Sequence, residues 1–416
     1  MIYLILCAIF IINHRRDKNS ISIFLFLLMA LSVIFSVITG RLQELSGDYI
    51  LSELYIGFVL YILFYGYRNY SNLKGYSFSD ISILKFDRIE PYIKWVNIIF
   101  FAINLFVFIS VFTLLSSGLI TVQEHKNEGG AAEIFSSLLP SYYISLSFLL
   151  SPVAYFSLVF HFYYMLQGKL HKAILHLILS LGLVLSGLMA LSRSTLIIYV
   201  MVYVGIYFFL MPIIPSAIGK KIKVAIIVAI GSLGVIFSSI SETRFGERYN
   251  IESKPMIDEQ KYPQLVSMLD YYSQWVYYGP KLLERYSPSD LSYGLYNSSG
   301  LAVLIQQRLQ GAAKVNQARE RKYGRIMGDL GSAFHGCIVR CVFDFGYIGT
   351  ILFILLNVYF IKCFRPREGL INLKTLLSLP ILLSFCLGFF TGNNYSSLAI
   401  NLAVIYMWIF YIIVKK

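Results

Sequence analysis

The chain has 416 residues, of which 57% are hydrophobic and 14% are charged, and its mean hydropathy is +0.68. Soluble domains carry about 25% charged residues, so the composition excludes an ordinary soluble protein. Apolar runs of about 20 residues recur along the chain and predict an all-α, polytopic membrane protein. The formal net charge of +13 does not indicate nucleic-acid binding, because the placement of the basic residues explains it.

About eleven segments are apolar enough to be transmembrane helices. They are residues 1–13, 21–39, 50–66, 96–115, 142–166, 173–190, 195–212, 224–240, 334–361, 376–391 and 397–413. The first is short for a bilayer core of about 30 Å. The chain is therefore expected to form one integrated membrane domain with three parts: an N-terminal transmembrane bundle (1–240), a large helical loop (241–333) and C-terminal transmembrane helices (334–416).

Lysine and arginine distribute unevenly between the two sets of connecting segments. They gather in residues 14–20, 67–95, 167–172, 213–223, 362–375 and 414–416. The short segments of the other set hold only Arg41, Lys126 and Arg193. Because cytoplasmic segments carry the excess of basic residues, this distribution predicts a cytoplasmic C-terminus and a loop outside the membrane. The N-terminus lies outside only if residues 1–13 form a full span.

The large loop is expected to be mostly helical. Apolar residues recur at helical spacing at Leu265, Met268, Leu269 and Tyr272. We expect Gly279-Pro280 to break this helix, with a short helix following to Tyr286. A second helix is expected after Asn297-Ser298-Ser299-Gly300, running toward Lys322 with a weak point at Gly311.

Three arginines near the predicted outer ends of spans are candidates for chemistry. Arg193 lies in the short turn LSRST between two spans, where its guanidinium can form two hydrogen bonds with a phosphate or mark a helix end. Arg244 and Arg248 follow the eighth span four residues apart, so both can point the same way. The alternative is that they pair with Glu242 and Glu247.

The ninth span opens with three polar residues. His335 lies at the boundary of loop and membrane, and the pKa of histidine suits a general acid or base, although a lone histidine can also be structural. Arg340 and Asp344 are four residues apart on one predicted helix and could form a structural ion pair. No spacing of His, Cys, Asp or Glu predicts a metal site, and no cofactor is expected.

Aromatic side chains are dense in the loop. Tyrosine and tryptophan rings can stack on sugars and donate hydrogen bonds, but they also form belts at the lipid headgroups. For Tyr271 to Tyr278, a stretch that includes Trp275, the two interpretations stay open. For Tyr293 and Tyr296 we favour contact with sugar.

Several of these features together resemble the bacterial oligosaccharide repeat-unit polymerases, the O-antigen polymerase (Wzy-type) family. The similarity lies in the long late loop, its tyrosine-rich helix, the turn Ser292-Tyr293-Gly294 and the span opening FDFGYIG at 343–349. The LSRST turn at Arg193 is also similar. The resemblance covers the overall architecture and residues 185–360.

The resemblance implies a glycosyltransferase in the bacterial cytoplasmic (inner) membrane. Donor and acceptor would be undecaprenyl-pyrophosphate-linked oligosaccharides, reached laterally from membrane lipid, and the product would be O-antigen, capsule or a similar polysaccharide. It leaves room for a membrane partner that regulates chain length. In this interpretation His335 is the acid/base, Trp275, Tyr293 and Tyr296 contact sugar, and arginines bind the leaving pyrophosphate. Those arginines are Arg193, Arg244 and Arg248, with Arg308 and Arg325 in second rank.

Two alternatives remain. An O-antigen ligase uses the same donor with another acceptor and needs the same loop and basic residues. A lipid-linked oligosaccharide flippase or other transporter belongs to a different class. Transporters usually have repeated halves or broken helices around a midplane site. The sequence shows neither, and its intramembrane charges are predicted near the outer edge.

Overall fold

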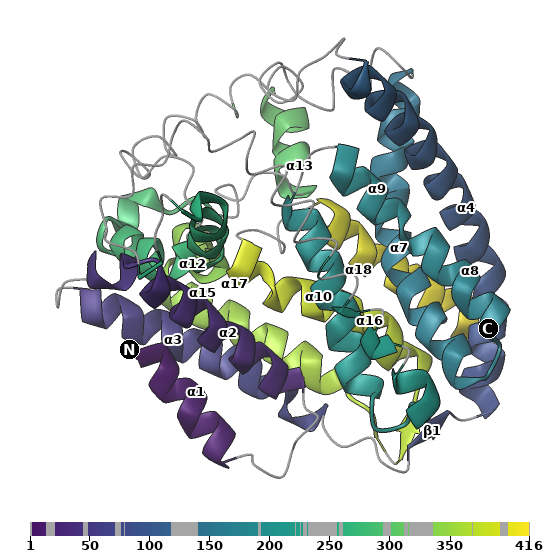
Figure 1. The fold of residues 1–416 in the computed structure, drawn as a ribbon, viewed down its shortest axis with the longest axis horizontal. Coiled ribbons are helices and arrows are strands. Elements are labelled where there is room, and N and C mark those ends of the chain that lie inside the picture. Colours follow the sequence, from purple (N-terminus) through teal and green to yellow (C-terminus); the bar gives the residue numbers. More distant parts are fainter. Residues whose placement is uncertain are drawn as a thin grey trace. The chain divides into compact units, whose positions relative to one another are not determined.

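A computed structural model gives the fold of the chain. It describes residues 2–13, 21–44, 49–70, 76–78, 80–117, 140–189, 193–220, 222–224, 226–227, 231, 256–257, 261–293, 301–311, 315, 336–367, 369–391 and 398–415. Nearly all of these residues are helical (Figure 1).

Among the described residues, six helices are long and apolar enough to cross a membrane. They are Ile21–Ile38, Ile50–Arg68, Ile83–Leu114, Ser145–Leu166, Leu170–Met189 and Gly336–Phe364. Shorter apolar helices occupy Ile2–Asn13, Thr195–Leu210, Leu373–Cys386 and Ile400–Ile413. The chain is thus an all-α, membrane-embedded protein. The number of eleven spans and the loop outside the membrane stay predictions, and the span predicted at 224–240 falls mostly outside the described residues.

Contacts between residues group the chain into two compact units instead of three parts in chain order. The first unit comprises residues 1–72, 248–365 and 384–401, and the second comprises 73–247, 366–383 and 402–416. Each unit therefore combines segments that are far apart in the sequence.

The first unit contains α1 (Ile2–Asn13), α2 (Ile21–Ile38), η1 (Arg41–Glu44), α3 (Ile50–Tyr65), η3 (Gly66–Asn69), α12 (Pro263–Glu284), η4 (Pro288–Asp290), α13 (Leu301–Gln310), α15 (Gly336–Phe364) and α17 (Gly388–Thr391). Helix α12, drawn in green, packs against α2 and α3, drawn in purple, although it follows them by some 200 residues in the chain (Figure 1). The tyrosine-rich part of the predicted loop is therefore part of this helical unit.

Helix α12 does not end where the sequence predicts. It passes through Gly279-Pro280 and continues to Glu284. Pro280 lacks the N–H that would donate to the carbonyl four residues earlier. The last turn nevertheless holds, because Leu282 and Leu283 are fully buried there. The predicted break at Gly279-Pro280 is therefore wrong.

The second predicted loop helix begins where expected and ends early. Helix α13 starts at Leu301, directly after Gly300, and ends at Gln310. Gly311 follows with a φ of +89°, a left-handed conformation that suits glycine and ends a helix. The weak point predicted at Gly311 is thus the end of the helix. Of the continuation toward Lys322, only Val315 is described.

The second unit is a bundle built around one long helix. Its elements are β1 (Ser77–Phe78), α4 (Asp80–Ser116), α7 (Ser141–Leu166), α8 (Leu170–Ser180), α9 (Gly182–Met189), α10 (Arg193–Leu210) and β2 (Leu370–Ile371). α16 (Leu373–Cys386) and α18 (Leu398–Lys415) follow in the chain and divide between the units: residues 373–383 and 402–415 belong to the second unit, and 384–386 and 398–401 belong to the first. Helix α4 packs against α7, α8 and α9 (Figure 1). β1 and β2 form a short parallel pair, in which Ser77 is opposite Leu370.

Two predicted spans of this unit have different bounds in the structure. The span expected at 96–115 begins at Asp80, because Phe86, Ile89 and Ile93 continue its buried face through a charged stretch. The span expected at 173–190 consists of α8 and α9, which are separated at Leu181.

Candidate functional site

Five of the predicted site residues lie outside the described part of the chain. This holds for His335, Arg244, Arg248, Arg325 and Tyr296. Only the backbone of Arg193 is described, as the first residue of α10 in the second unit. Arg308 is exposed near the end of α13 in the first unit. The convergence of these arginines on one site therefore stays a prediction.

Trp275 is an interior residue of the first unit. It is 2% exposed, and its ring centroid lies 5.3 Å from those of Tyr3 and Phe389, edge to face in both pairs. A Cβ added to Gly336 would lie 3.3 Å from Cβ of Trp275, so the start of α15 approaches closely. The indole has no open face for a sugar in this packing. Trp275 instead supports the backbone directly after His335.

Tyr293 is exposed at the end of the described segment 261–293, and its contact with sugar stays a prediction. Its side chain is 78% exposed, and its backbone has a φ of +52°, unusual for a residue other than glycine. Its backbone N–H donates to the carbonyl oxygen of Asp344 at 3.0 Å. This hydrogen bond joins the end of segment 261–293 to α15, and it fixes the backbone that carries the exposed Tyr293 ring.

Helix α15 is broken at Gly346, which has φ +72° and ψ 176°, a conformation open essentially only to glycine. A break of this kind frees carbonyl groups in the preceding turn. The Ser292 N–H donates to the carbonyl of Phe343 at 2.9 Å, as Tyr293 does to that of Asp344. The Ser292 hydroxyl lies 2.8 Å from Oδ1 of Asp344 and 3.0 Å from the Phe343 carbonyl, so it can donate to either. Residues 292–293 thus donate hydrogen bonds to the carbonyl groups that the break in α15 leaves without helical partners.

Asp344 is fully buried and Arg340 is partly exposed, one turn earlier on α15. The Ser292 hydroxyl gives the Asp344 carboxylate a donor from another segment of the chain. The predicted ion pair between Arg340 and Asp344 stays a prediction.

Tyrosine rings surround the break in α15. Tyr286 lies edge to face against Phe343 and Tyr347, with centroids 5.4 Å apart in each pair. The hydroxyl of Tyr55 donates to the carbonyl of Tyr347 at 2.7 Å. Burial, and then the charge of Asp290, raise the pKa of Tyr286 above its usual value. The phenol therefore stays neutral, and its ring packs against these neighbours.

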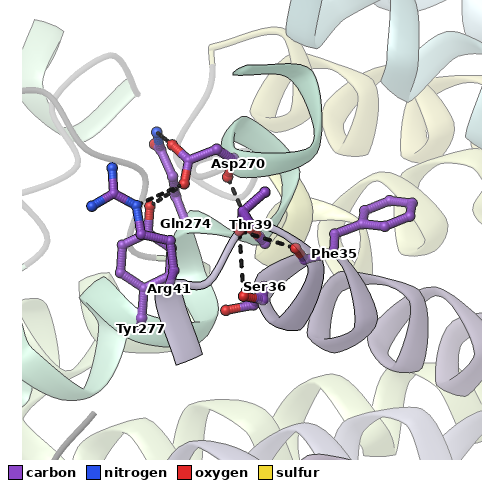
Figure 2. Close-up of polar contacts among 8 residues, drawn as sticks. Phe35, Ser36, Thr39, Arg41, Asp270, Gln274 and Tyr277 are labelled. Atoms are coloured by element: carbon purple, nitrogen blue, oxygen red, sulfur yellow. Dashed lines mark hydrogen bonds and ion pairs between the residues drawn. The ribbon is translucent and has the colours of Figure 1, made fainter. Parts of the chain in front are cut away.

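A second polar cluster joins η1 to α12, and Figure 2 shows it. Nε of Arg41 lies 3.1 Å from Oδ1 of Asp270, and the hydroxyl of Tyr277 donates to the same oxygen at 2.8 Å. The side-chain amide of Gln274 donates to Oδ2 at 3.4 Å. The guanidinium of Arg41 also lies over the Tyr277 ring, 5.5 Å from its centroid. Burial, then the Asp270 charge, raise the pKa of Tyr277 well above its usual value.

The end of α2 places Arg41 in this cluster. The helix stops at Thr39-Gly40, where Gly40 has a φ of +76° and the Thr39 hydroxyl lies 3.0 Å from the Phe35 carbonyl and 3.3 Å from that of Ser36 (Figure 2). Arg41 follows at once and turns toward α12. Its side chain is 12% exposed, and that of Asp270 is 1% exposed.

Sequence reasoning missed this cluster. It used Arg41 only as a marker of topology and the tyrosines only as contacts to sugar or to lipid headgroups. The available signal was the spacing of Asp270, Gln274 and Tyr277, which places three polar groups on one helical face. Their partner on η1 is 229 residues away, and no local pattern points to it.

The second unit holds buried titratable groups of its own. Nε2 of His176 lies 3.5 Å from the Glu90 carboxylate, and Nζ of Lys172 lies 3.8 Å from it. His161 approaches the Ala173 carbonyl at 2.9 Å and the Tyr203 hydroxyl at 3.1 Å. The two histidines thus have partners within the helix bundle.

Within the described ranges, no group of three His, Cys, Asp or Glu side chains is placed to hold a metal ion. Comparison with known proteins adds no relative: no family model, no curated protein and no solved structure matches the chain.

Proposed function

We propose that the protein is a bacterial membrane glycosyltransferase that polymerises repeat units carried on undecaprenyl pyrophosphate. One observation supports this most: the two short motifs behind the resemblance contact each other. Ser292 and Tyr293 of the SYG turn bond to Phe343 and Asp344 of FDFGYIG, 51 residues further along for each pair. Motifs that are distant in sequence and adjacent in space form one structural unit, as a shared site requires.

The reaction proceeds at the outer face of the cytoplasmic membrane. An acceptor hydroxyl attacks the anomeric carbon of the donor, and the bond from that carbon to the lipid pyrophosphate breaks. The pyrophosphate leaves with the electron pair, and a base takes the hydroxyl proton. His335 is the proposed base, while Arg193, Arg244 and Arg248 stabilise the leaving charge.

Other residues of the first unit have supporting roles in this proposal. Tyr293 presents an exposed ring at the base of the loop, and Tyr296 follows it in the chain. Arg308 and Arg325 are the remaining basic candidates. Trp275 packs against Gly336 at the start of α15 and is an interior residue that does not touch sugar.

Glycan length in cells tests the proposal. Arg193→Ala and Arg244→Ala should each reduce the product to single repeat units at normal protein level, because the leaving pyrophosphate loses a positive partner. Lys261→Ala, an exposed basic residue at the start of α12, serves as the matched control and should leave long polymer. Full-length polymer from both arginine variants would contradict the site assignment.

The same measurement separates a polymerase from an O-antigen ligase. If the arginine variants lose long glycans but still transfer single repeat units, the protein is a polymerase. Loss of all transfer identifies a ligase.

A transporter remains the second candidate, and one observation favours it. Helix α15 is broken at Gly346, whereas the sequence pattern predicts no broken helix. Broken helices often offer backbone groups to a transported substrate. Here Ser292 and Tyr293 already bond to the freed carbonyls, which favours a docking role for the break. Extension of lipid-linked repeat units by purified protein in detergent, where no compartment exists, would exclude transport alone.

A further inference from the structure

Three helices of the first unit, α3, α12 and α15, meet where α15 is broken (Figure 1). The hydroxyl of Tyr55 on α3 donates to the Tyr347 carbonyl on α15, and the two rings lie edge to face with their centroids 4.8 Å apart. The Tyr347 hydroxyl donates in turn to the carbonyl of Leu283, near the end of α12, at 3.3 Å. These contacts hold the two tyrosines beside the last turn of α12.

A carboxylate lies at the same junction. Glu284 follows Leu283, ends α12 and is exposed. Among the described residues its hydrogen bond comes from the Ser52 hydroxyl on α3, which donates to Oε1 at 2.8 Å. One bond orients the carboxylate and leaves acceptor capacity on its oxygens, since an ionised carboxylate accepts about four hydrogen bonds. The exposed group is therefore suited to accept from the hydroxyls of a ligand.

Two further tyrosines extend the group toward solvent. Tyr286 contacts Tyr347 edge to face, and Tyr293 lies near enough to Tyr286 to be a cause, after burial and Asp290, of its raised pKa. Tyr293 is mostly exposed, yet its backbone is left-handed, which costs a residue of this kind about 1–3 kcal/mol. Strain of this sort gathers at sites that hold ligands. The hydrogen bonds to α15 keep the strained turn in place.

An aromatic belt at the lipid headgroups is the other interpretation of exposed tyrosines. A belt requires neither a strained backbone nor a carboxylate that a serine of another helix orients. Exposed phenol rings beside an oriented carboxylate are instead suited to a sugar, because the rings can cover its apolar face while the carboxylate accepts from its hydroxyls. The negative charge disfavours a sugar that carries a carboxylate of its own.

We propose that Tyr293, Tyr347 and Glu284 form a binding site for an uncharged sugar of the glycan, and that Glu284 selects against acidic sugars. The inference rests on the proposed function, because it names the class of sugar that the polymerase takes. It also makes a claim about binding that is tested without catalysis.

The test measures binding of methyl glycosides to the purified full chain by saturation-transfer NMR. The neutral probes are the methyl glycosides of glucose, galactose, mannose and N-acetylglucosamine, and the acidic probes are methyl glucuronide and methyl galacturonide. The detergent is an amine oxide, because the headgroup of a maltoside detergent is itself a sugar. Wild-type protein should bind at least one neutral probe, and it should bind the acidic probes several-fold more weakly because of the Glu284 charge.

Variants of the two exposed groups give the sharper result. Tyr293→Ala should weaken binding of the neutral probe about two- to tenfold, whereas Tyr293→Phe keeps the ring and should bind nearly as wild type does. Glu284→Gln should weaken the neutral probe several-fold and bind the acidic probes better than wild type does, since the amide keeps an acceptor for Ser52 and removes the charge. Tyr359→Ala is the matched control, because Tyr359 is an exposed tyrosine near the other end of α15.

A damaged fold would weaken every probe, so a gain for the acidic probes in Glu284→Gln supports the site. Failure of wild-type protein to bind any neutral probe would overturn the proposal, and this is the result that a belt at the headgroups predicts. Equal binding by wild type and Tyr293→Ala would overturn it as well. An unchanged preference for neutral over acidic probes in Glu284→Gln would overturn the selective role of the carboxylate.

Extension of lipid-linked repeat units, measured on the same samples, separates the two proposals. If wild-type protein extends glycans but binds no neutral probe, the sugar site falls and the polymerase assignment stands. If wild-type protein binds a neutral probe through Tyr293 and extends nothing, the sugar site stands and the polymerase assignment falls.

Discussion

The two units bury polar groups in different ways. In the first unit, a charge pair links two segments 229 residues apart, and Asp270 accepts from Arg41, Gln274 and Tyr277. In the second unit, α4 carries Glu90, Asn97 and Asn104 at intervals of seven residues, and all three are buried. Residues seven apart lie near one helical face, so α4 presents a polar stripe to its neighbours.

The asparagines of that stripe bond mostly to backbone. Nδ2 of Asn97 donates to the carbonyls of Ile93 and Val153, and Nδ2 of Asn104 donates to the Phe100 carbonyl and to Ser147. Such amides hold membrane helices together, with a contribution of about 0.6 kcal/mol per bond. Their partners belong to the same packed helices.

The cluster in the first unit depends on side chains for nearly every contact. Removing Arg41 or Asp270 leaves the other charge buried without its ion pair, whereas removing an asparagine of α4 leaves only neutral groups. We therefore expect the loss of Arg41 or Asp270 to destabilise the first unit more than the loss of Asn97 or Asn104 destabilises the second.

The largest expected effect is that of Asp270→Ala. The change deprives the largely buried Arg41 of its carboxylate and should lower the free energy of unfolding by about 3–5 kcal/mol. Unfolding in detergent can be followed with a thiol-reactive dye, because Cys337 and Cys386 of the same unit are fully buried. The dye reacts as the unit opens.

Asp290→Ala is the matched control for this variant. Asp290 is a buried carboxylate on the same segment, and it accepts from the backbone N–H of Ser287 at 2.9 Å. Loss of such a cap costs about 1 kcal/mol. If Asp290→Ala and Asp270→Ala lower the free energy of unfolding equally, then the charge cluster is no more important for stability than another buried, hydrogen-bonded carboxylate.

A smaller effect is expected for Tyr277→Phe. The change removes the 2.8 Å hydrogen bond to Asp270 and keeps the ring, so the loss should be about 1–2 kcal/mol at neutral pH. Burial, and then Asp270, hold the pKa of Tyr277 well above its usual value. In the unfolded chain the phenol ionises near pH 10. Its stabilisation is therefore complete below that pH and is lost as the pH rises toward the folded pKa.

Alkaline unfolding tests this contribution. Wild-type protein should lose stability above pH about 10 more steeply than Tyr277→Phe, which has no phenol at that position. Parallel pH profiles for the two proteins would show that the Tyr277 hydroxyl is not held in the neutral form by its surroundings.

The contrast also shows which parts of the molecule follow from local sequence. Apolar runs predict most helices, since a chain in a bilayer must bury its backbone polar groups in its own hydrogen bonds. They miss the first part of α4, where Lys85, Asp87, Arg88 and Glu90 interrupt the run although Phe86 and Ile89 continue the buried face. The buried residues of this stretch still recur with the helical period of 3.6 residues, although the mean hydropathy of the stretch is lower.

Helix α12 shows a second limit. The stripe of Leu265, Met268, Leu269 and Tyr272 predicts the helix correctly, yet Leu265 is 40% exposed, while the buried face carries Asp270, Ser273 and Gln274. Polar side chains on a buried helix face need hydrogen-bond partners from other segments of the chain. Arg41 is such a partner for Asp270. Tertiary contacts of this kind have no local signature.

The smallest expected effect is that of Asn97→Leu on α4. The change removes two hydrogen bonds to backbone carbonyls, but it also removes Oδ1, which has no hydrogen-bond partner among the described residues. The two effects oppose each other, so the free energy of unfolding should change by less than about 1 kcal/mol. The cysteines all belong to the first unit, so the free energy of unfolding of this variant is measured by the loss of helical circular dichroism in denaturant, with Asp270→Ala measured in the same way. A loss as large as that of Asp270→Ala would mean that the polar stripe of α4 is itself a sensitive network, and the difference between the two units would then lie in location alone.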